Sequence, residues 1–173
     1  FDFGNQLHVA IRSIAATNNK NIILNIYGTG SEQQELGAKK LIKRLNISDQ
    51  ILFHGFCPYS EIQNKMRKAD LMFFTSVSEG TPTVIMESIS NHLPILCHDA
   101  CGFGAVVNEN IGIKVRLSHP SRSIAQFAES INDLYYNRNK LIEFSNNCLS
   151  HKQNISWDNN AIRVTEFYRK LTN

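Results

Sequence analysis

The chain has 173 residues, 42% of them hydrophobic, and carries a formal net charge of +3 at pH 7. This length suits one domain, and the apolar content is enough for a hydrophobic core. The small net charge and scattered basic residues do not indicate nucleic-acid binding. No run of about 18 apolar residues predicts a membrane-spanning helix, and no signal peptide is recognisable, so we expect a soluble protein.

The four cysteines, Cys57, Cys97, Cys101 and Cys148, form no C-x-x-C pair. This usage is typical of a reduced, cytosolic protein. Cys97, His98 and Cys101 lie close together in the sequence, but no second ligand pair follows at the spacing of a zinc site. We therefore expect no bound metal.

Helix and strand patterns alternate along the chain. Leu7, Ala10, Ile11 and Ile14 recur at helical spacing and predict a helix over residues 5–17. Short apolar runs predict buried strands at 22–27, 51–54, 71–74, 94–97 and 113–115. Helical patterns separate them at 32–45, from 60, at 82–91 and, as a short turn, near 105–108.

The last third of the chain is predicted to be helical. An amphipathic helix spans residues 124–135, and a second helix follows over 141–149. Five apolar residues then step by four, three, four and three, which predicts a final helix from about residue 156: Trp157, Ala161, Val164, Tyr168 and Leu171.

Alternating strands and helices predict an α/β domain with a parallel sheet. In such sheets ligands bind outside the carboxyl ends of the strands. Four predicted loops lie at that edge: 28–31, 55–58, 75–81 and 98–104. Gly28 and Gly30 lie in the first of these loops, where they either admit a ligand close to the backbone or simply make a tight turn.

Two carboxylates, Glu79 and Glu87, flank a predicted helix start. Thr81 can cap this helix, and Pro82 suits its first position, where an N–H has no partner. A helix N-terminus attracts phosphate groups. Carboxylates beside an anion site indicate a ligand that carries hydroxyl groups as well as phosphates, and a nucleotide sugar has both.

With these motifs the chain resembles the C-terminal, donor-binding domain of a retaining GT-B glycosyltransferase of the group 1, or family 4, type. Residues 21–36 resemble the family's strand, Gly-x-Gly turn and helix. Residues 51–103 resemble its Gly-Phe turn, Ala-Asp strand, Ser-x-Glu-Gly motif with two glutamates, and Leu-Pro-Ile strand. Residues 108–115 resemble its Asn-Glu-x-x-Gly-Ile turn, and residues 155–171 its closing helix.

The resemblance implies a Rossmann-like doubly wound parallel sheet and a role for each site residue. Glu87 would accept hydrogen bonds from the ribose hydroxyls of the donor, and Glu79, the candidate catalytic residue, would contact the transferred sugar. The remaining donor-binding residues would meet sugar, phosphate or base, largely through backbone groups: Gly80, Thr81, Thr83, Val84, Phe56, Cys57, Gly28 and Gly30. The resemblance implies neither a metal nor a cofactor.

Two family features do not appear in the sequence. The family's first strand, which would lie between the strands at 22–27 and 71–74, has no counterpart, and Phe3-Gly4 stands where Lys-Gly is expected. The family's diphosphate-binding cations are therefore missing, and Lys20, Lys65 and Lys114 are poor substitutes by position. We interpret residues 1–173 as a single donor-binding domain, with a core over 1–150 and a helix at 156–172 that packs toward an absent N-terminal acceptor domain.

The expected function is sugar transfer with retention from a nucleotide-diphosphate sugar to a sugar or lipid-linked acceptor, in cell-surface polysaccharide or lipopolysaccharide synthesis. We expect the full-length protein to be a hexosyltransferase that acts in the cytoplasm, either free or at the inner face of the membrane. We expect the isolated fragment to be inactive. The alternatives are a sugar-nucleotide epimerase of the same fold and a non-catalytic nucleotide-sugar binding module. The sequence does not identify the sugar, base or acceptor.

Overall fold

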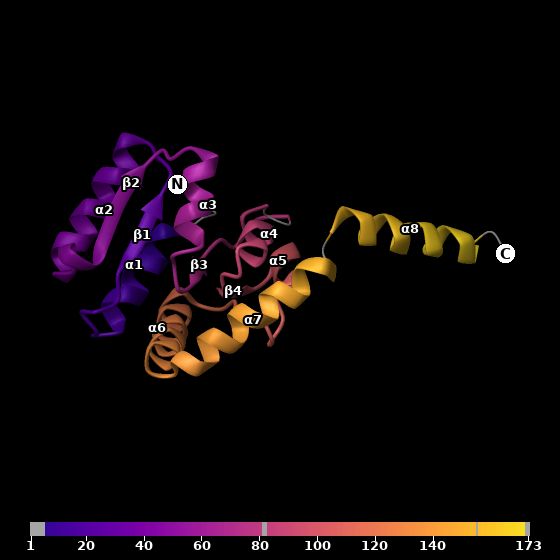
Figure 1. Ribbon diagram of the computed structural model, residues 1–173. Coiled ribbons are helices and arrows are strands. Elements are labelled where there is room, and N and C mark those ends of the chain that lie inside the picture. Colours follow the sequence, from indigo (N-terminus) through magenta and orange to yellow (C-terminus); the bar gives the residue numbers. More distant parts are fainter. Residues whose placement is uncertain (1–5, 81–82, 155, 172–173) are drawn as a thin grey trace.

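The structure is a computed structural model that describes residues 6–80, 83–154 and 156–171. Helices and strands alternate through the first two thirds of the chain, and three helices follow (Figure 1). The strands are β1 (Leu24–Tyr27), β2 (Ile51–Gly55), β3 (Met72–Phe74), β4 (Ile95–Asp99) and β5 (Gly112–Arg116). The helices are α1 (Leu7–Ala16), α2 (Glu32–Leu45), η1 (Ser48–Gln50, a 3-10 turn), α3 (Tyr59–Met66), α4 (Thr83–Ser90), α5 (Cys101–Val106), α6 (Pro120–Tyr136), α7 (Arg138–Asn154) and α8 (Trp157–Leu171).

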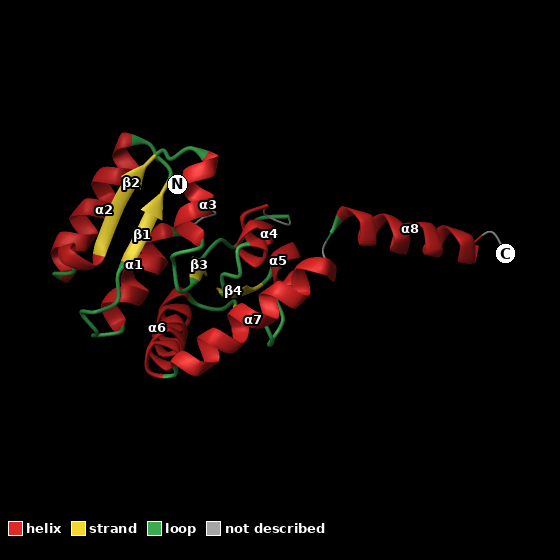
Figure 2. Cartoon of the chain, viewed as in Figure 1, coloured by secondary structure: helices red, strands yellow, loops and turns green. Residues whose placement is uncertain are grey.

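All strand pairs are parallel, which confirms the predicted fold class. In the described residues the strands form two groups, β1–β2 and β3–β4–β5. Figure 2 shows the β1–β2 pair apart from β3 and β4. The division between β1 and β3 falls where the resemblance places the family's first strand.

Helices pack on both faces of the sheets, as expected for a doubly wound fold. The side chain of Leu96 in β4 enters a core with residues of α1, α2 and α6. Its neighbours Ile95 and Cys97 point to the opposite face and pack with residues of α4, α5 and α7. Ile26 of β1 belongs to the first core as well, so this core joins the two strand groups.

The ends of α2 show why the sequence forms a helix there. The Ser31 side chain accepts a hydrogen bond from the backbone N–H of Gln34, and the Gln34 side chain accepts one from the N–H of Ser31. This reciprocal capping box satisfies two backbone donors at the helix start. Asn46 ends the helix in the left-handed conformation, with φ of 55°.

The prediction of a loop over residues 98–104 is wrong, and the helical turn predicted near 105–108 is part of a longer helix that starts earlier, at Cys101, and ends at Val106. His98 and Asp99 continue β4 because they pair with Val115 and Arg116 of β5. Helix α5 then begins at once, at Cys101, and buries Phe103 in the second core. The glycines in this stretch favoured the interpretation as a loop, but burial of Phe103 in the second core stabilises a helix instead.

The last helix, α8, extends away from the rest of the chain (Figure 1). None of its described residues is buried, and its predicted apolar stripe is exposed. Trp157 has 88% of its surface accessible, Phe167 61% and Leu171 66%.

Candidate functional site

Three of the predicted site loops follow the carboxyl ends of β1, β2 and β3. The loop after β1 contacts the end of β2 directly, because the N–H of Gly28 donates to the carbonyl of Gly55 at 2.7 Å. The loop after β3 is tied to the start of α5, where the Cys101 Sγ contacts the carbonyl of Val77 at 3.4 Å. This edge is where ligands bind in open parallel α/β sheets.

Gly28 and Gly55 adopt backbone conformations that favour glycine. Their φ angles are 106° and 66°. A Cβ atom built on either residue meets nothing within 4 Å, so the conformation and not crowding requires glycine. Gly30 directs its N–H toward the Glu35 carboxylate at 3.4 Å. The loop after β1 thus turns tightly into α2, and the space around Gly28 stays open.

The predicted base-contacting residues follow β2. Phe56 is exposed, with 82% of its surface accessible. Cys57 is half-buried. Partial burial raises the pKa of the Cys57 thiol, and the adjacent Glu61 carboxylate acts in the same direction. The thiol therefore stays protonated at neutral pH and is not an activated nucleophile.

The predicted sugar and phosphate contacts surround the start of α4. Glu79 is half-buried in the loop after β3, and Gly80 is exposed next to it. Thr83 and Val84 are the first two residues of α4; Thr83 is exposed, whereas Val84 packs partly against the second core. Thr81 and Pro82, the predicted cap and first helical residue, lie outside the described residues.

Glu87 is half-buried on α4 and is held by a contact that sequence reasoning missed. The Gln63 side chain of α3 donates from Nε2 to Glu87 Oε2 at 3.2 Å. Asn91, one turn after Glu87, donates to Gln63 Oε1 and to the Glu87 carbonyl. Gln63 and Asn91 carry no motif or periodic signal that could have identified them, since the contact joins two separate helices.

The lysines considered as diphosphate contacts have other partners or lie elsewhere. Lys114 Nζ forms an ion pair with Asp99 at 3.2 Å and donates to the Gly104 carbonyl at 2.9 Å. Lys65 lies 4.0 Å from Glu61. Lys20 is exposed in the loop that precedes β1, at the amino end of the strands.

Within the described part of the chain, no group of three or more His, Cys, Asp and Glu side chains could hold a metal ion. Cys97 and His98 are both buried, and they point to opposite faces of β4 because neighbours in a strand alternate. Burial raises the pKa of Cys97 to about 12. Burial also lowers the pKa of His98, while the Val115 backbone opposes this shift; its ring packs edge-on against Phe127.

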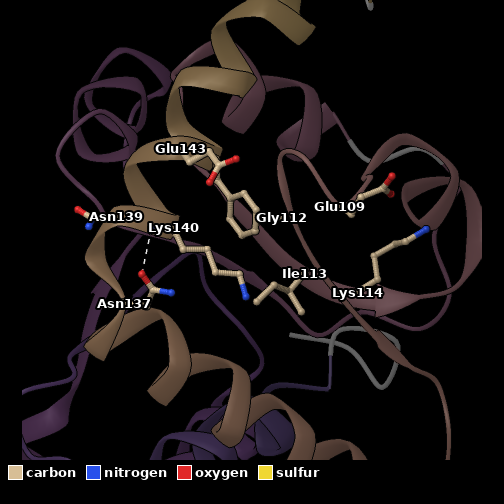
Figure 3. A pocket seen from close by; sticks show the side chains of 9 residues that line it. Glu109, Gly112, Ile113, Lys114, Asn137, Asn139, Lys140 and Glu143 are labelled. Carbon is tan, nitrogen blue, oxygen red and sulfur yellow. Dashed lines mark hydrogen bonds between the residues drawn. The ribbon is translucent and has the colours of Figure 1, made fainter.

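A cavity of about 660 Å³ lies between β5 and the junction of α6 with α7 (Figure 3). None of the predicted site residues lines it. Its lining residues come from the start of β5, the preceding turn, the junction of α6 with α7, and α7: Glu109, Gly112, Ile113, Lys114, Asn137, Asn139, Lys140, Glu143 and Phe144. Because this cavity does not lie at the carboxyl edge of the strands, we place the functional site at the edge loops instead.

The parallel α/β fold, with helices on both faces of its sheets, is the fold of GT-B glycosyltransferases. The chain belongs to the family Glycosyl transferases group 1, whose model matches residues 5–150. Crystal structures with this fold include HepE (Alr3699) of Anabaena in complex with UDP, with a TM-score of 0.82 and 20% identity over 96% of this chain and 46% of that one. WaaG, a glycosyltransferase involved in lipopolysaccharide biosynthesis, has a TM-score of 0.76 and 19% identity over 88% of this chain and 40% of its own.

Curated relatives are similar at low identity. Protein CapJ of Staphylococcus aureus is 28% identical over 152 residues, which are 86% of this chain and 36% of CapJ. The lipopolysaccharide 1,6-galactosyltransferase of Escherichia coli is 25% identical, over 66% of this chain and 38% of that enzyme. The chain thus spans about a third of the length of the curated relatives it matches. No helix among its described residues is long and apolar enough to cross a membrane.

Proposed function

We propose that this chain is the donor-binding half of a glycosyltransferase that moves a sugar from a nucleotide-diphosphate sugar to an acceptor with retention. The observation that carries the proposal is the placement of Glu87. It lies on the helix after β3, and its carboxylate accepts a hydrogen bond from Gln63 on the helix that follows β2. HepE has the same fold, and its complexes with UDP and with UDP-glucose support the choice of a nucleotide-diphosphate sugar as donor.

In this proposal the two carboxylates recognise hydroxyl groups. Glu87 accepts hydrogen bonds from the ribose, and such charge-assisted bonds are stronger than neutral ones. Glu79 contacts hydroxyls of the transferred sugar. Phe56 and Cys57 hold the base, while Gly28 and Gly30 leave room for the diphosphate.

The start of α4 would act on the leaving group. Negative charge grows on the nucleoside diphosphate as the glycosidic bond breaks, and fixed N–H dipoles stabilise such charge. Gly80, Thr81, Thr83 and Val84 are the residues whose backbone N–H groups would supply these dipoles. This role needs neither a metal nor a cofactor, and we assign no carboxylate as a covalent nucleophile.

The acceptor side of the reaction would come from an N-terminal domain, because GT-B enzymes react in the cleft between two domains. The apolar stripe of α8 would pack toward that domain. The isolated chain then binds donor weakly and transfers no sugar. The relative named as a lipopolysaccharide 1,6-galactosyltransferase favours a hexosyltransferase of cell-surface polysaccharide synthesis, acting in the cytoplasm or at the inner membrane face on a sugar or lipid-linked acceptor.

The test is binding of UDP to the intact protein by calorimetry, compared with its Glu87→Ala variant. Loss of a hydrogen-bonding charged group should weaken UDP binding by about 10- to 100-fold. Glu129→Ala, which removes an exposed carboxylate from α6, is the matched control and should bind as the parent does. If neither the parent nor the variant binds any nucleoside diphosphate, the donor-site proposal is wrong, and product analysis then distinguishes an epimerase from a binding module.

A further inference from the structure

Gln63 connects two helices that belong to different strand groups. It lies on α3, which follows β2, and its Nε2 donates to the carboxylate of Glu87 on α4, which follows β3. We propose that Gln63 is a positioning residue that orients Glu87 for the ribose diol of the donor. This inference rests on the proposed function of the site.

Asn91 fixes the direction of the Gln63 amide. Asn91 Nδ2 lies against Gln63 Oε1 and also donates to the Glu87 carbonyl at 2.8 Å. An amide NH₂ group can only donate, so the Gln63 atom that faces it must be the oxygen. The nitrogen of Gln63 therefore faces Glu87, and the pair works as a one-directional relay from Asn91 through Gln63 to the carboxylate.

This relay leaves Glu87 enough capacity for two ribose hydroxyls. An ionised carboxylate offers about four lone-pair sites. Gln63 occupies one site on Oε2, and no other side-chain hydrogen bond to Glu87 occurs among the described residues. Because the carboxylate is half-buried and held from one side, its remaining sites are directed away from α3.

A positioning role for Gln63 and a purely structural role predict different effects on ligand affinity. If Gln63 only stabilises the packing of α3 on α4, its loss weakens every nucleotide equally. If it orients Glu87 for the diol, its loss weakens UDP but leaves 2′,3′-dideoxy-UDP unaffected. The measured quantity is therefore the ratio of the two dissociation constants.

The first experiment measures both ligands by calorimetry with the intact protein and its Gln63→Leu variant. Leucine keeps similar bulk and removes the donor. The affinity for UDP should fall about tenfold, the usual scale for one hydrogen bond to a charged group, while the affinity for the dideoxy analogue changes less than about twofold. Asn64→Leu, on the neighbouring and exposed position of α3, is the matched control and should change neither affinity.

The second variant is Asn91→Asp, which changes no predicted ligand contact. A carboxylate at position 91 can only accept, so the Gln63 amide must turn its nitrogen toward it and present its oxygen to Glu87. The Gln63 amide oxygen then faces the Glu87 carboxylate oxygen. The affinity for UDP should fall again, while the affinity for 2′,3′-dideoxy-UDP should not. Thermal unfolding of each variant checks that the fold is retained, and either variant alone is sufficient for the test.

The outcomes separate this inference from the proposed function. If Glu87→Ala does not change the UDP to dideoxy-UDP ratio, the ribose role of Glu87 is wrong. If Glu87→Ala removes the preference for UDP but Gln63→Leu and Asn91→Asp keep it, the proposed function stands and the positioning role of Gln63 is refuted. An equal weakening of both ligands in the Gln63 variant also refutes it.

Discussion

Gly112 shows how a single residue sets the spacing of two strands. It pairs with Ile95 across the β4–β5 ladder. A Cβ atom on Gly112 would lie 2.0 Å from the Ile95 carbonyl oxygen and 2.9 Å from its carbon. Both are backbone atoms, so the contact cannot be relieved by rotating a side chain. Only glycine lets these strands approach as they do.

We predict that Gly112→Ala lowers the free energy of unfolding by about 1–3 kcal/mol, the usual range for an overpacked interior. Gly37→Ala is the control, and it should raise the free energy of unfolding. A Cβ atom at Gly37 meets nothing within 4 Å, and alanine in a helix interior is favoured over glycine by roughly 0.5–1 kcal/mol. Urea unfolding measures both, and equal stability of the Gly112 variant and the parent would show that β5 moves freely.

At the scale of single residues, the sequence predicted which element carries a side chain better than it predicted which side chains are in contact. The motif that contains Glu79 and Glu87 was sufficient to place one carboxylate on a loop and the other on a helix, and the structure has both there. The Gln63 contact was not predictable, because a polar pair between two helices leaves no periodic pattern. The need for glycine at position 112 also depends on its partner strand, which the local sequence does not specify.

Secondary-structure elements were predictable where local signals agreed. Helix α2 has the predicted bounds because its caps and its apolar face point to the same interval. The start of helix α5 was missed because its glycines favour a turn locally, while the burial of Phe103 comes from the rest of the fold. Propensity is a weak guide when tertiary packing opposes it.

The capping box of α2 gives a test at the scale of the element. Ser31→Ala removes the side-chain acceptor for the Gln34 N–H and should lower the free energy of unfolding by about 1 kcal/mol. The exposed Gln33 lies two positions further along, and Gln33→Ala should have little effect since alanine is the better helix former. Thermal unfolding compares the two, and an unchanged Ser31 variant would mean that the cap adds nothing to helix stability.

Over the whole molecule, the sequence predicted the α/β class, the parallel strands and helices on both faces. The division of the strands into two groups was not predicted; it falls where the resemblance places the family's first strand, between 22–27 and 71–74. The one-sided apolar pattern of α8 predicts a helix with one face packed against another surface, and in this structure that face is exposed.

Because α8 buries none of its described residues, the rest of the fold should not depend on it. We predict that a chain ending at residue 154 has a free energy of unfolding within about 0.5 kcal/mol of the parent, the usual effect of a change at the surface. The comparison variant is Phe144→Ala on α7, whose side chain is 6% exposed and whose loss should cost about 3–5 kcal/mol. A large loss of stability on removing α8 would reveal packing that the structure lacks.

The bond between Gln63 and Glu87 also has a mechanical consequence. One partner belongs to the connection that leaves β2, and the other to the helix that follows β3, so the bond crosses the division between the strand groups. A shear of one group past the other would separate the Gln63 amide from the Glu87 carboxylate and would also strain the first core, which joins the two groups. A ligand that demands the oriented carboxylate therefore resists that shear, and by thermodynamic linkage the shear opposes the ligand. If the proposed function holds, nucleotide affinity at this site would report how firmly the two strand groups are held in register.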